Sequence, residues 1–275
     1  MKLSIFYAHL IEAARESGRP MADLCSEVRA AGIEAVDLMY EELTDKSLPD
    51  CKSFGFALSG VPVWFDFAHK PFSKSDLAFL DDLRRADAAR ALLLPARFEP
   101  EDDREALMPR ILDATAAVAE ACKKAGIEPT MEICGRRNVP FHRPADLQRF
   151  LDAIPSLGVT IDTGNCTWSD TDLLEFYASV RSRVNYVHAK DYARMPFNGE
   201  AAILSGDGRE FYGCPVGAGM IPLRPFFRNL ARDGYDGTMV LEFSGVHKLE
   251  SAIVASASFV RDEWEQAVKA AGKGA

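Results

Sequence analysis

The sequence lacks several features that would place it in a particular class. No hydrophobic run approaches the about 20 residues of a membrane-spanning helix. The six cysteines include no CxxC pair, and a chain of 275 residues does not need disulfides to fold. Lys and Arg number 32 against 41 Asp and Glu, which gives a net charge of −9. We therefore expect a cytoplasmic protein without a membrane partner, and without a nucleic-acid partner, because nucleic-acid affinity comes mostly from clustered basic residues.

The N-terminal segment lacks two further signals. No small-residue cleavage pattern follows the first apolar stretch, so we interpret this stretch as a strand and not as a secretion signal. The turn after it, Ala8 to Glu12, contains no glycine, whereas a doubly wound nucleotide-binding sheet usually carries a glycine-rich loop there. The chain also shows no linker or domain boundary. We predict one domain over residues 1–275.

What the sequence does contain is an alternation of short strand-like runs with longer segments of helical period. Eight runs rich in β-branched and aromatic residues predict strands: Leu3–Tyr7, Ala35–Met39, Phe54–Ser59, Ala91–Pro95, Pro129–Ile133, Val159–Asp162, Tyr186–Ala189 and Thr238–Phe243. Helices are predicted between and after them, at Pro20–Ala31, Asp76–Ala89, Arg104–Ala125, Pro144–Ala153, Thr171–Val180, Leu223–Ala231 and Ser251–Ala271. This alternation predicts an α/β fold, a (β/α)₈ TIM barrel.

Two connections differ from the others in composition. Gly60–Ser73 is aromatic and follows the third predicted strand, so we expect it to cap the mouth of the barrel. Its Trp64, Phe67 and His69 are candidates for a pocket wall, although an ordinary packed loop explains them nearly as well. Tyr192–Ile221 is the longest connection and is rich in Gly and Pro, and we place it as a loop over the same mouth.

Four consecutive predicted strands end in a residue that can bind a metal ion: Glu132, Asp162, His188 and Glu242. In a barrel the C-terminal strand ends share one rim, so these side chains can converge. Three carboxylates and one imidazole suit a divalent ion of hard to borderline character. We expect Mn²⁺ first, with Mg²⁺, Co²⁺ or Zn²⁺ as alternatives. Any one of these residues alone could equally be a helix cap or a structural residue.

The chain resembles the sugar phosphate isomerase and epimerase superfamily, the xylose isomerase-like TIM barrels. The resemblance covers most of the chain and rests on five segments: MEICG at 131–135, VTIDTGN at 159–165, YVHAKD at 186–191, PVGAGMI at 215–221 and DGYDGTMVLEF at 233–243. It implies a metal held by Glu132, Asp162, His188 and Glu242. It also implies that Glu132 and Glu242 are the catalytic pair that removes and returns a proton beside a carbonyl.

The resemblance predicts a metal-dependent isomerase or epimerase that acts on a small sugar, keto-sugar or polyol through an enediolate. A lyase or dehydratase that starts with the same proton abstraction is the alternative. Asn165 stands where many members have a histidine, and Asn138 stands where sugar epimerases often have a carboxylate. Both differences weaken the epimerase prediction and keep the lyase as a near alternative. Two further alternatives are disfavoured. An apurinic endonuclease would need more than the five histidines present. A barrel without catalytic function would have no use for the four converging ligand candidates.

Four residues are predicted to contact the substrate: His9, Asn165, Lys190 and Arg194. Lys190 could instead pair with an acid such as Asp191, and Arg194 could be a solvated loop charge. His142 and His247 are interpreted as structural. The partner expected is a small carbohydrate-like molecule, and formation of a homo-oligomer stays open.

Overall fold

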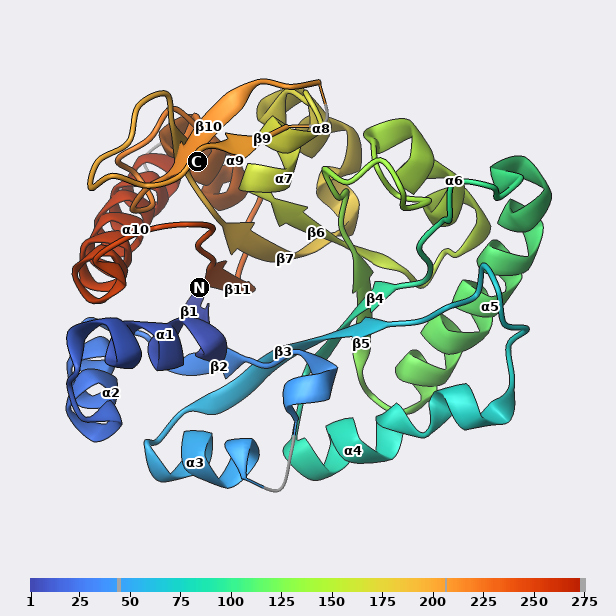
Figure 1. The fold of residues 1–275 in the computed structure, drawn as a ribbon, viewed down its shortest axis with the longest axis horizontal. Coiled ribbons are helices and arrows are strands. Elements are labelled where there is room, and N and C mark those ends of the chain that lie inside the picture. Colours follow the sequence, from blue (N-terminus) through green and yellow to red (C-terminus); the bar gives the residue numbers. More distant parts are fainter. Residues whose placement is uncertain (44–45, 206, 273–275) are drawn as a thin grey trace.

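Eight parallel strands close into a barrel in the computed structural model, which describes residues 1–43, 46–205 and 207–272. The order around the barrel is β1-β11-β7-β6-β5-β4-β3-β2, so strands that follow one another in the chain are neighbours. Figure 1 shows the strands around the centre and the helices outside them. The predicted (β/α)₈ TIM barrel is confirmed. The barrel strands are Lys2–Phe6 (β1), Ala35–Asp37 (β2), Ala57–Trp64 (β3), Arg90–Leu94 (β4), Glu128–Met131 (β5), Gly158–Asp162 (β6), Val184–Ala189 (β7) and Thr238–Leu241 (β11).

The helices form the outer layer and turn their apolar faces toward the strands. The long helix α5 is typical: Asp103 caps its start by accepting from the N–H of Ala106, and Ile111, Val118 and Cys122 are buried on one face. None of the described helices is long and apolar enough to span a membrane. The α-helices are Tyr7–Ser17 (α1), Met21–Ala30 (α2), Ser47–Ser53 (α3), Phe79–Ala86 (α4), Arg104–Lys124 (α5), Pro144–Ala153 (α6), Thr163–Trp168 (α7), Leu173–Val180 (α8), Leu223–Arg232 (α9) and Leu249–Gly272 (α10). Three short 3₁₀ turns are Tyr40–Glu42 (η1), Lys74–Leu77 (η2) and Arg181–Arg183 (η3).

The third strand is where the prediction from sequence was wrong. It was placed at Phe54–Ser59, but β3 runs from Ala57 to Trp64, so the first part of the presumed cap is barrel wall. Gly60 and Pro62 argued against a strand because glycine weakens strands and proline lacks an N–H donor. The buried apolar side chains around Pro62 outweigh this cost, and Pro62 pairs in register with Leu92 of β4.

Two other parts of the chain contain more regular structure than predicted. Helices α1, α3 and α7 were not anticipated, because each is short or begins within a segment interpreted as a strand end. The connection Tyr192–Ile221, of which residue 206 lies outside the described residues, contains a small antiparallel sheet. Its strands are Tyr192–Ala193 (β8), Ile203–Leu204 (β9) and Glu210–Gly213 (β10), in the order β8-β10-β9.

The interior of the barrel contains a buried polar network below the mouth. Asp37, at the end of β2, accepts hydrogen bonds from Ser4 (2.7 Å) and from the hydroxyl of Tyr186 (2.7 Å to Oδ2). Ser59 contacts the same hydroxyl at 2.8 Å. Gly60 has no room for a side chain, because a Cβ there would lie 2.7 Å from both Asp37 and Tyr186. The network links strands β1, β2, β3 and β7 across the lumen.

Asp37 makes the stability of the protein depend on pH. Burial raises the pKa of Asp37 from 3.8 to about 6, so its contribution to stability is present at acid pH and is lost as the pH rises through 6. A shift of about two units corresponds to about 3 kcal/mol. We expect Asp37→Asn to gain stability relative to the wild type by this amount between pH 4 and pH 7.5. Urea unfolding of both proteins in EDTA measures it, and a constant difference across this range would contradict the prediction.

Candidate metal centre

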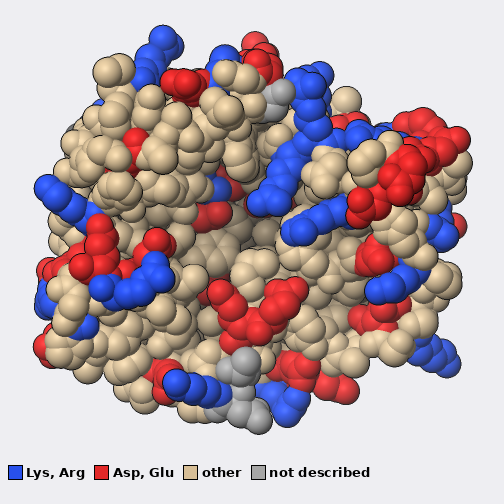
Figure 2. Space-filling model, viewed as in Figure 1, with Lys and Arg blue, Asp and Glu red and all other residues tan. Residues whose placement is uncertain are grey.

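Four ligand candidates lie at the C-terminal ends of four neighbouring strands, at the barrel mouth. Asp162 is the last residue of β6 and pairs in register with His188 of β7. Glu132 follows β5 directly, and Glu242 follows β11, where its N–H donates to the carbonyl of Ala189 (3.1 Å). The barrel order β11-β7-β6-β5 therefore brings together residues that are spread over 111 positions of the chain. Figure 2 shows the hollow near the centre of this face, with charged side chains of both signs around it.

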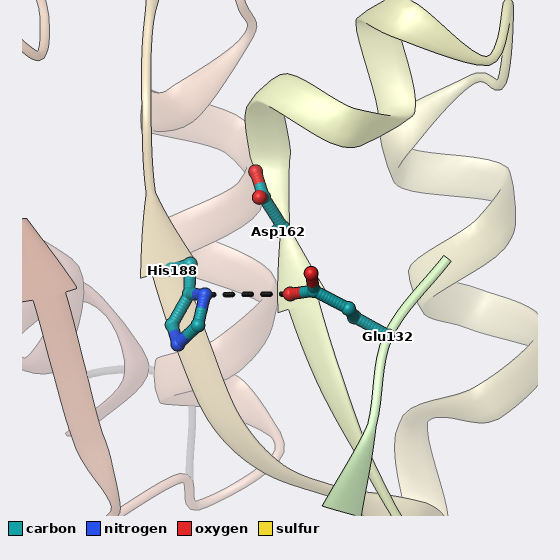
Figure 3. A group of neighbouring side chains, drawn as sticks. All are labelled: Glu132, Asp162 and His188. Atoms are coloured by element: carbon teal, nitrogen blue, oxygen red, sulfur yellow. Dashed lines mark ion pairs between the residues drawn. The ribbon is translucent and has the colours of Figure 1, made fainter. Parts of the chain in front are cut away.

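Three of the four side chains form a close group. The ligand atoms of Glu132, Asp162 and His188 all lie within 4.8 Å of one another, and the three residues are buried. Figure 3 shows Glu132 and His188 pointing toward each other as an ion pair, with Asp162 beside them at the end of β6. Glu242 is not part of this close group, but its Oε2 lies 3.3 Å from His188 Nδ1, the same distance as Glu132 Oε2. Two carboxylates thus flank one imidazole nitrogen.

The spacing of these atoms fits a metal site better than a set of hydrogen bonds. Charge-assisted hydrogen bonds between nitrogen and carboxylate are about 2.7–2.9 Å long. Two ligands held tetrahedrally at about 2.0–2.1 Å from one ion are about 3.3 Å apart. Glu132 Oε2 and both ring nitrogens of His188 are enclosed, yet they lack a hydrogen-bond partner among the described residues. Buried polar atoms are rarely left unpaired, so the donor set fits a bound cation.

Lys190 is a buried cation beside this group. Its Nζ lies 2.7 Å from Glu242 Oε1 and 3.1 Å from Asp162 Oδ2. Burial alone would lower the pKa of Lys190, but the two carboxylates raise it well above its ordinary value, so the side chain is an ammonium. Its backbone is held by Thr163, whose Oγ1 accepts from the N–H of Lys190 at 2.9 Å. Gly164 leaves space for its methylene chain, since a Cβ there would lie 2.4 Å from Lys190 Cδ.

Asn165 holds two of the ligand candidates in place. Its side-chain amide donates to Glu132 Oε1 (3.1 Å), and its backbone N–H donates to Asp162 Oδ1 (3.0 Å). The N–H of Gly164 donates to the same oxygen at 2.8 Å. Asn165 was predicted to meet the substrate, and the structure places its amide against Glu132. An amide in this position orients the carboxylate but cannot carry a proton near neutral pH.

The local environment separates the two glutamates electrostatically. Burial raises the pKa of Glu132, and the negative charges of Asp162 and Glu242 add to the effect. Burial acts in the same direction on Glu242, but Lys190 and His188 hold its pKa well below its ordinary value. Burial would lower the pKa of His188, yet Glu132 and Glu242 raise it well above its ordinary value. The lysine beside Glu242, which Glu132 lacks, accounts for much of this difference.

His9 lies at the edge of the same group. It was predicted to face the rim from the end of the first strand, whereas it lies in the first turn of α1. Its Nε2 accepts a hydrogen bond from the backbone N–H of Phe243 (3.0 Å), directly after Glu242. Burial lowers the pKa of His9 to about 4, so the ring is neutral at pH 7.

Arg194 is exposed and lines a surface hollow with Arg209, Phe211 and Met220. Within the described residues no hydrogen bond or ion pair joins Arg194 to any of the four ligand candidates.

Two further features were missed or misread. Asp191, considered as a partner for Lys190, instead accepts the backbone N–H groups of Tyr192, Gly217, Gly219 and Ile221 and fixes the loop that they belong to. The glycines of that segment were the sequence feature from which this role could have been predicted.

Trp64, Phe67 and His69 do line one cavity, of about 590 Å³, with Arg97 stacked 3.9 Å from the Trp64 ring centre. Arg97 had given no sequence signal.

Comparison with known proteins agrees with the barrel fold. A search of curated proteins found no match. Among solved structures, the chain is similar to the IOLI protein with a bound zinc atom (TM-score 0.72, 14% identity, 97% of this chain and 99% of that chain). It is similar to the probable 3-DHS dehydratase AsbF from Bacillus anthracis (0.70, 13%, 95% and 99%). It is also similar to D-psicose 3-epimerase in the presence of D-fructose (0.69, 12%, 96% and 99%).

These identities show a shared fold. Family membership rests on a separate finding, because residues 22–263, most of the chain, match the family described as xylose isomerase-like TIM barrel. The chain belongs to the xylose isomerase-like TIM barrel family.

Proposed function

We propose that this protein is a divalent-metal-dependent isomerase or epimerase of a small sugar, keto-sugar or polyol. The observation that carries the proposal is the buried group of Glu132, Asp162 and His188, with Glu242 3.3 Å from His188 Nδ1. We assign all four as ligands of one ion. Mn²⁺ is the metal proposed first, with Mg²⁺, Co²⁺ or Zn²⁺ as alternatives, because carboxylate oxygens with one imidazole suit ions of this range.

The catalytic roles follow from how the side chains lie. A divalent ion at this site would stabilise the negative charge that develops on a substrate carbonyl oxygen. Glu132 and Glu242 flank one point of the mouth, so one removes a proton from the carbon beside the carbonyl and the other returns it. Lys190 keeps Glu242 ionised, and Asn165 holds Glu132 in orientation. Arg194 keeps a proposed role only as a contact for an extended substrate at the rim.

A lyase or dehydratase is the second candidate, and Asn165 is the residue that favours it. Asn165 donates to Glu132 and cannot shuttle a proton, so the number of groups able to reprotonate an enediolate is small. An enediolate that is not reprotonated can expel a β-hydroxyl or a β-linked group. For both candidates we infer a small carbohydrate substrate. We also infer a reducing, cytoplasmic setting for both, which the six free, buried cysteines support.

Metal binding tests the site directly. Glu132→Gln and His188→Ala each remove one ligand, so we expect Mn²⁺ affinity to fall by more than the about 10–100-fold caused by losing a residue that only supports a ligand. Glu128→Gln is the matched control, because Glu128 lies at the other end of β5 and is exposed. Titration calorimetry and metal analysis measure the effect. A His188→Ala protein with unchanged metal affinity would contradict the ligand assignment.

Proton exchange tests the chemistry. We expect the metal-loaded protein to exchange the proton beside the carbonyl of a keto-sugar or inosose into D₂O. We expect Glu132→Gln to slow this by about 10²–10⁴-fold, the usual effect of losing a general base. NMR follows the exchange and mass spectrometry the product. A product of unchanged composition identifies an isomerase or epimerase, and loss of water or of a linked group identifies a lyase. Exchange that survives removal of the metal would contradict both.

A further inference from the structure

His9 is held in one place by three contacts. Its ring lies edge-on to the ring of Phe6, with 6.1 Å between the ring centroids, and edge-on to the ring of Phe243, with 5.3 Å between the centroids. Phe6 in turn contacts the ring of His188 at 5.4 Å. Glu242 and Lys190 are the charged groups whose fields act on His9. The imidazole therefore borders the ligand group on the side of β1 and β11.

The hydrogen bond from Phe243 determines which nitrogen of His9 carries the proton. The N–H of Phe243 lies beyond the end of β11, and it donates to His9 Nε2 at 3.0 Å. A nitrogen that accepts a hydrogen bond has its lone pair occupied and carries no proton, so the neutral ring must be protonated at Nδ1. None of the described residues accepts a hydrogen bond from this Nδ1–H. It is the one polar group of His9 left for a ligand.

We propose that His9 is a fixed hydrogen-bond donor to the substrate, through Nδ1–H to a carbonyl or hydroxyl oxygen, and takes no part in proton transfer. The proposal rests on the function proposed above and adds a catalytic role to it. Nε2 has no free lone pair with which to act as a base. A neutral Nδ1–H can polarise an oxygen without giving up its proton. The substrate class this favours is a polyhydroxy carbonyl compound that presents an oxygen on the β1 side of the mouth.

Lys190 does not make His9 redundant. Its ammonium is bonded to Glu242 and Asp162, so two of its three hydrogens are directed at carboxylates. Asn165 likewise directs its amide at Glu132. Lys190 and Asn165 are thus engaged with carboxylates, whereas the Nδ1–H of His9 has no protein acceptor within the described residues.

The first experiment reads the tautomer and needs neither metal nor substrate. NMR of protein labelled with ¹⁵N-histidine has five histidines to assign, and His9→Gln identifies the signal of His9. We expect an Nδ1–H ring that stays neutral from pH 5 to pH 8 in the metal-free protein. An Nε2–H ring, or a ring that titrates in this range, would overturn the proposal.

The second experiment reads the role. We expect His9→Phe to lower kcat of D₂O exchange by about 10²-fold, the usual effect of losing one preorganised donor, with Mn²⁺ affinity unchanged. His9→Gln retains an amide donor and an acceptor for Phe243, so we expect it to recover most of the rate. His247→Phe, at an exposed histidine, is the matched control. Melting curves establish that each variant is folded.

The two proposals fail in different ways. A folded His9→Phe protein with the exchange rate of the wild type would overturn the donor role alone. Absence of exchange by the metal-loaded wild type would overturn the donor role together with the proposed function. A rate lost equally in His9→Phe and His9→Gln, with both proteins destabilised, would make His9 a structural cap for Phe243 and also overturn the donor role.

Discussion

The barrel mouth depends on the neutralisation of carboxylates that are largely removed from water. Moving one such charge out of water costs several kcal/mol, so each needs partners. Asp162 has them, because two backbone N–H groups meet Oδ1 and Lys190 meets Oδ2. Glu242 shares Lys190, and Glu132 receives one amide. The oxygens of Glu132 and Glu242 that face His188 therefore have the proton of this imidazole as their balancing charge, and a bound cation would replace that proton.

Strand β7 organises both the mouth and its support. Alternate residues of a strand face the same side, and Tyr186 and His188 both face the lumen. Tyr186 closes the polar network with Asp37 below, and its ring lies 5.4 Å from the ring of His188 above. Lys190 follows at the strand end with the balancing charge, and Asp191 anchors the loop at 217–221. The run 186–191 thus supplies a residue of the buried polar network, a candidate metal ligand, a balancing positive charge and a residue that anchors a loop.

Residues at the strand ends of the site could be predicted from the sequence, whereas their tertiary partners could not. Asp162, His188 and Glu242 could be found because polar residues after apolar runs mark strand ends, and strand ends of a barrel meet. The tertiary partners could not be found in this way. Lys190 was predicted to contact the substrate, with its sequence neighbour Asp191 as the alternative partner, but it pairs with residues 28 and 52 positions away. The bounds of β3 were missed because local rules disfavour Gly60 and Pro62, and burial across the barrel outweighs those rules.

Under the proposed function, few groups around the site can carry a proton, whether the reaction is that of an isomerase or of a lyase. Asn165 cannot ionise, and the Nε2 of His9 already accepts from Phe243. Lys190 stays an ammonium between its two carboxylates. Among the described side chains around the site, we propose Glu132 and Glu242 to take a proton from the substrate, and the same pair must return it to carbon or deliver it to a leaving group. Because both outcomes use the same two carboxylates, the substrate decides between them: a good leaving group β to the carbonyl is expelled, and without one the carbon is reprotonated.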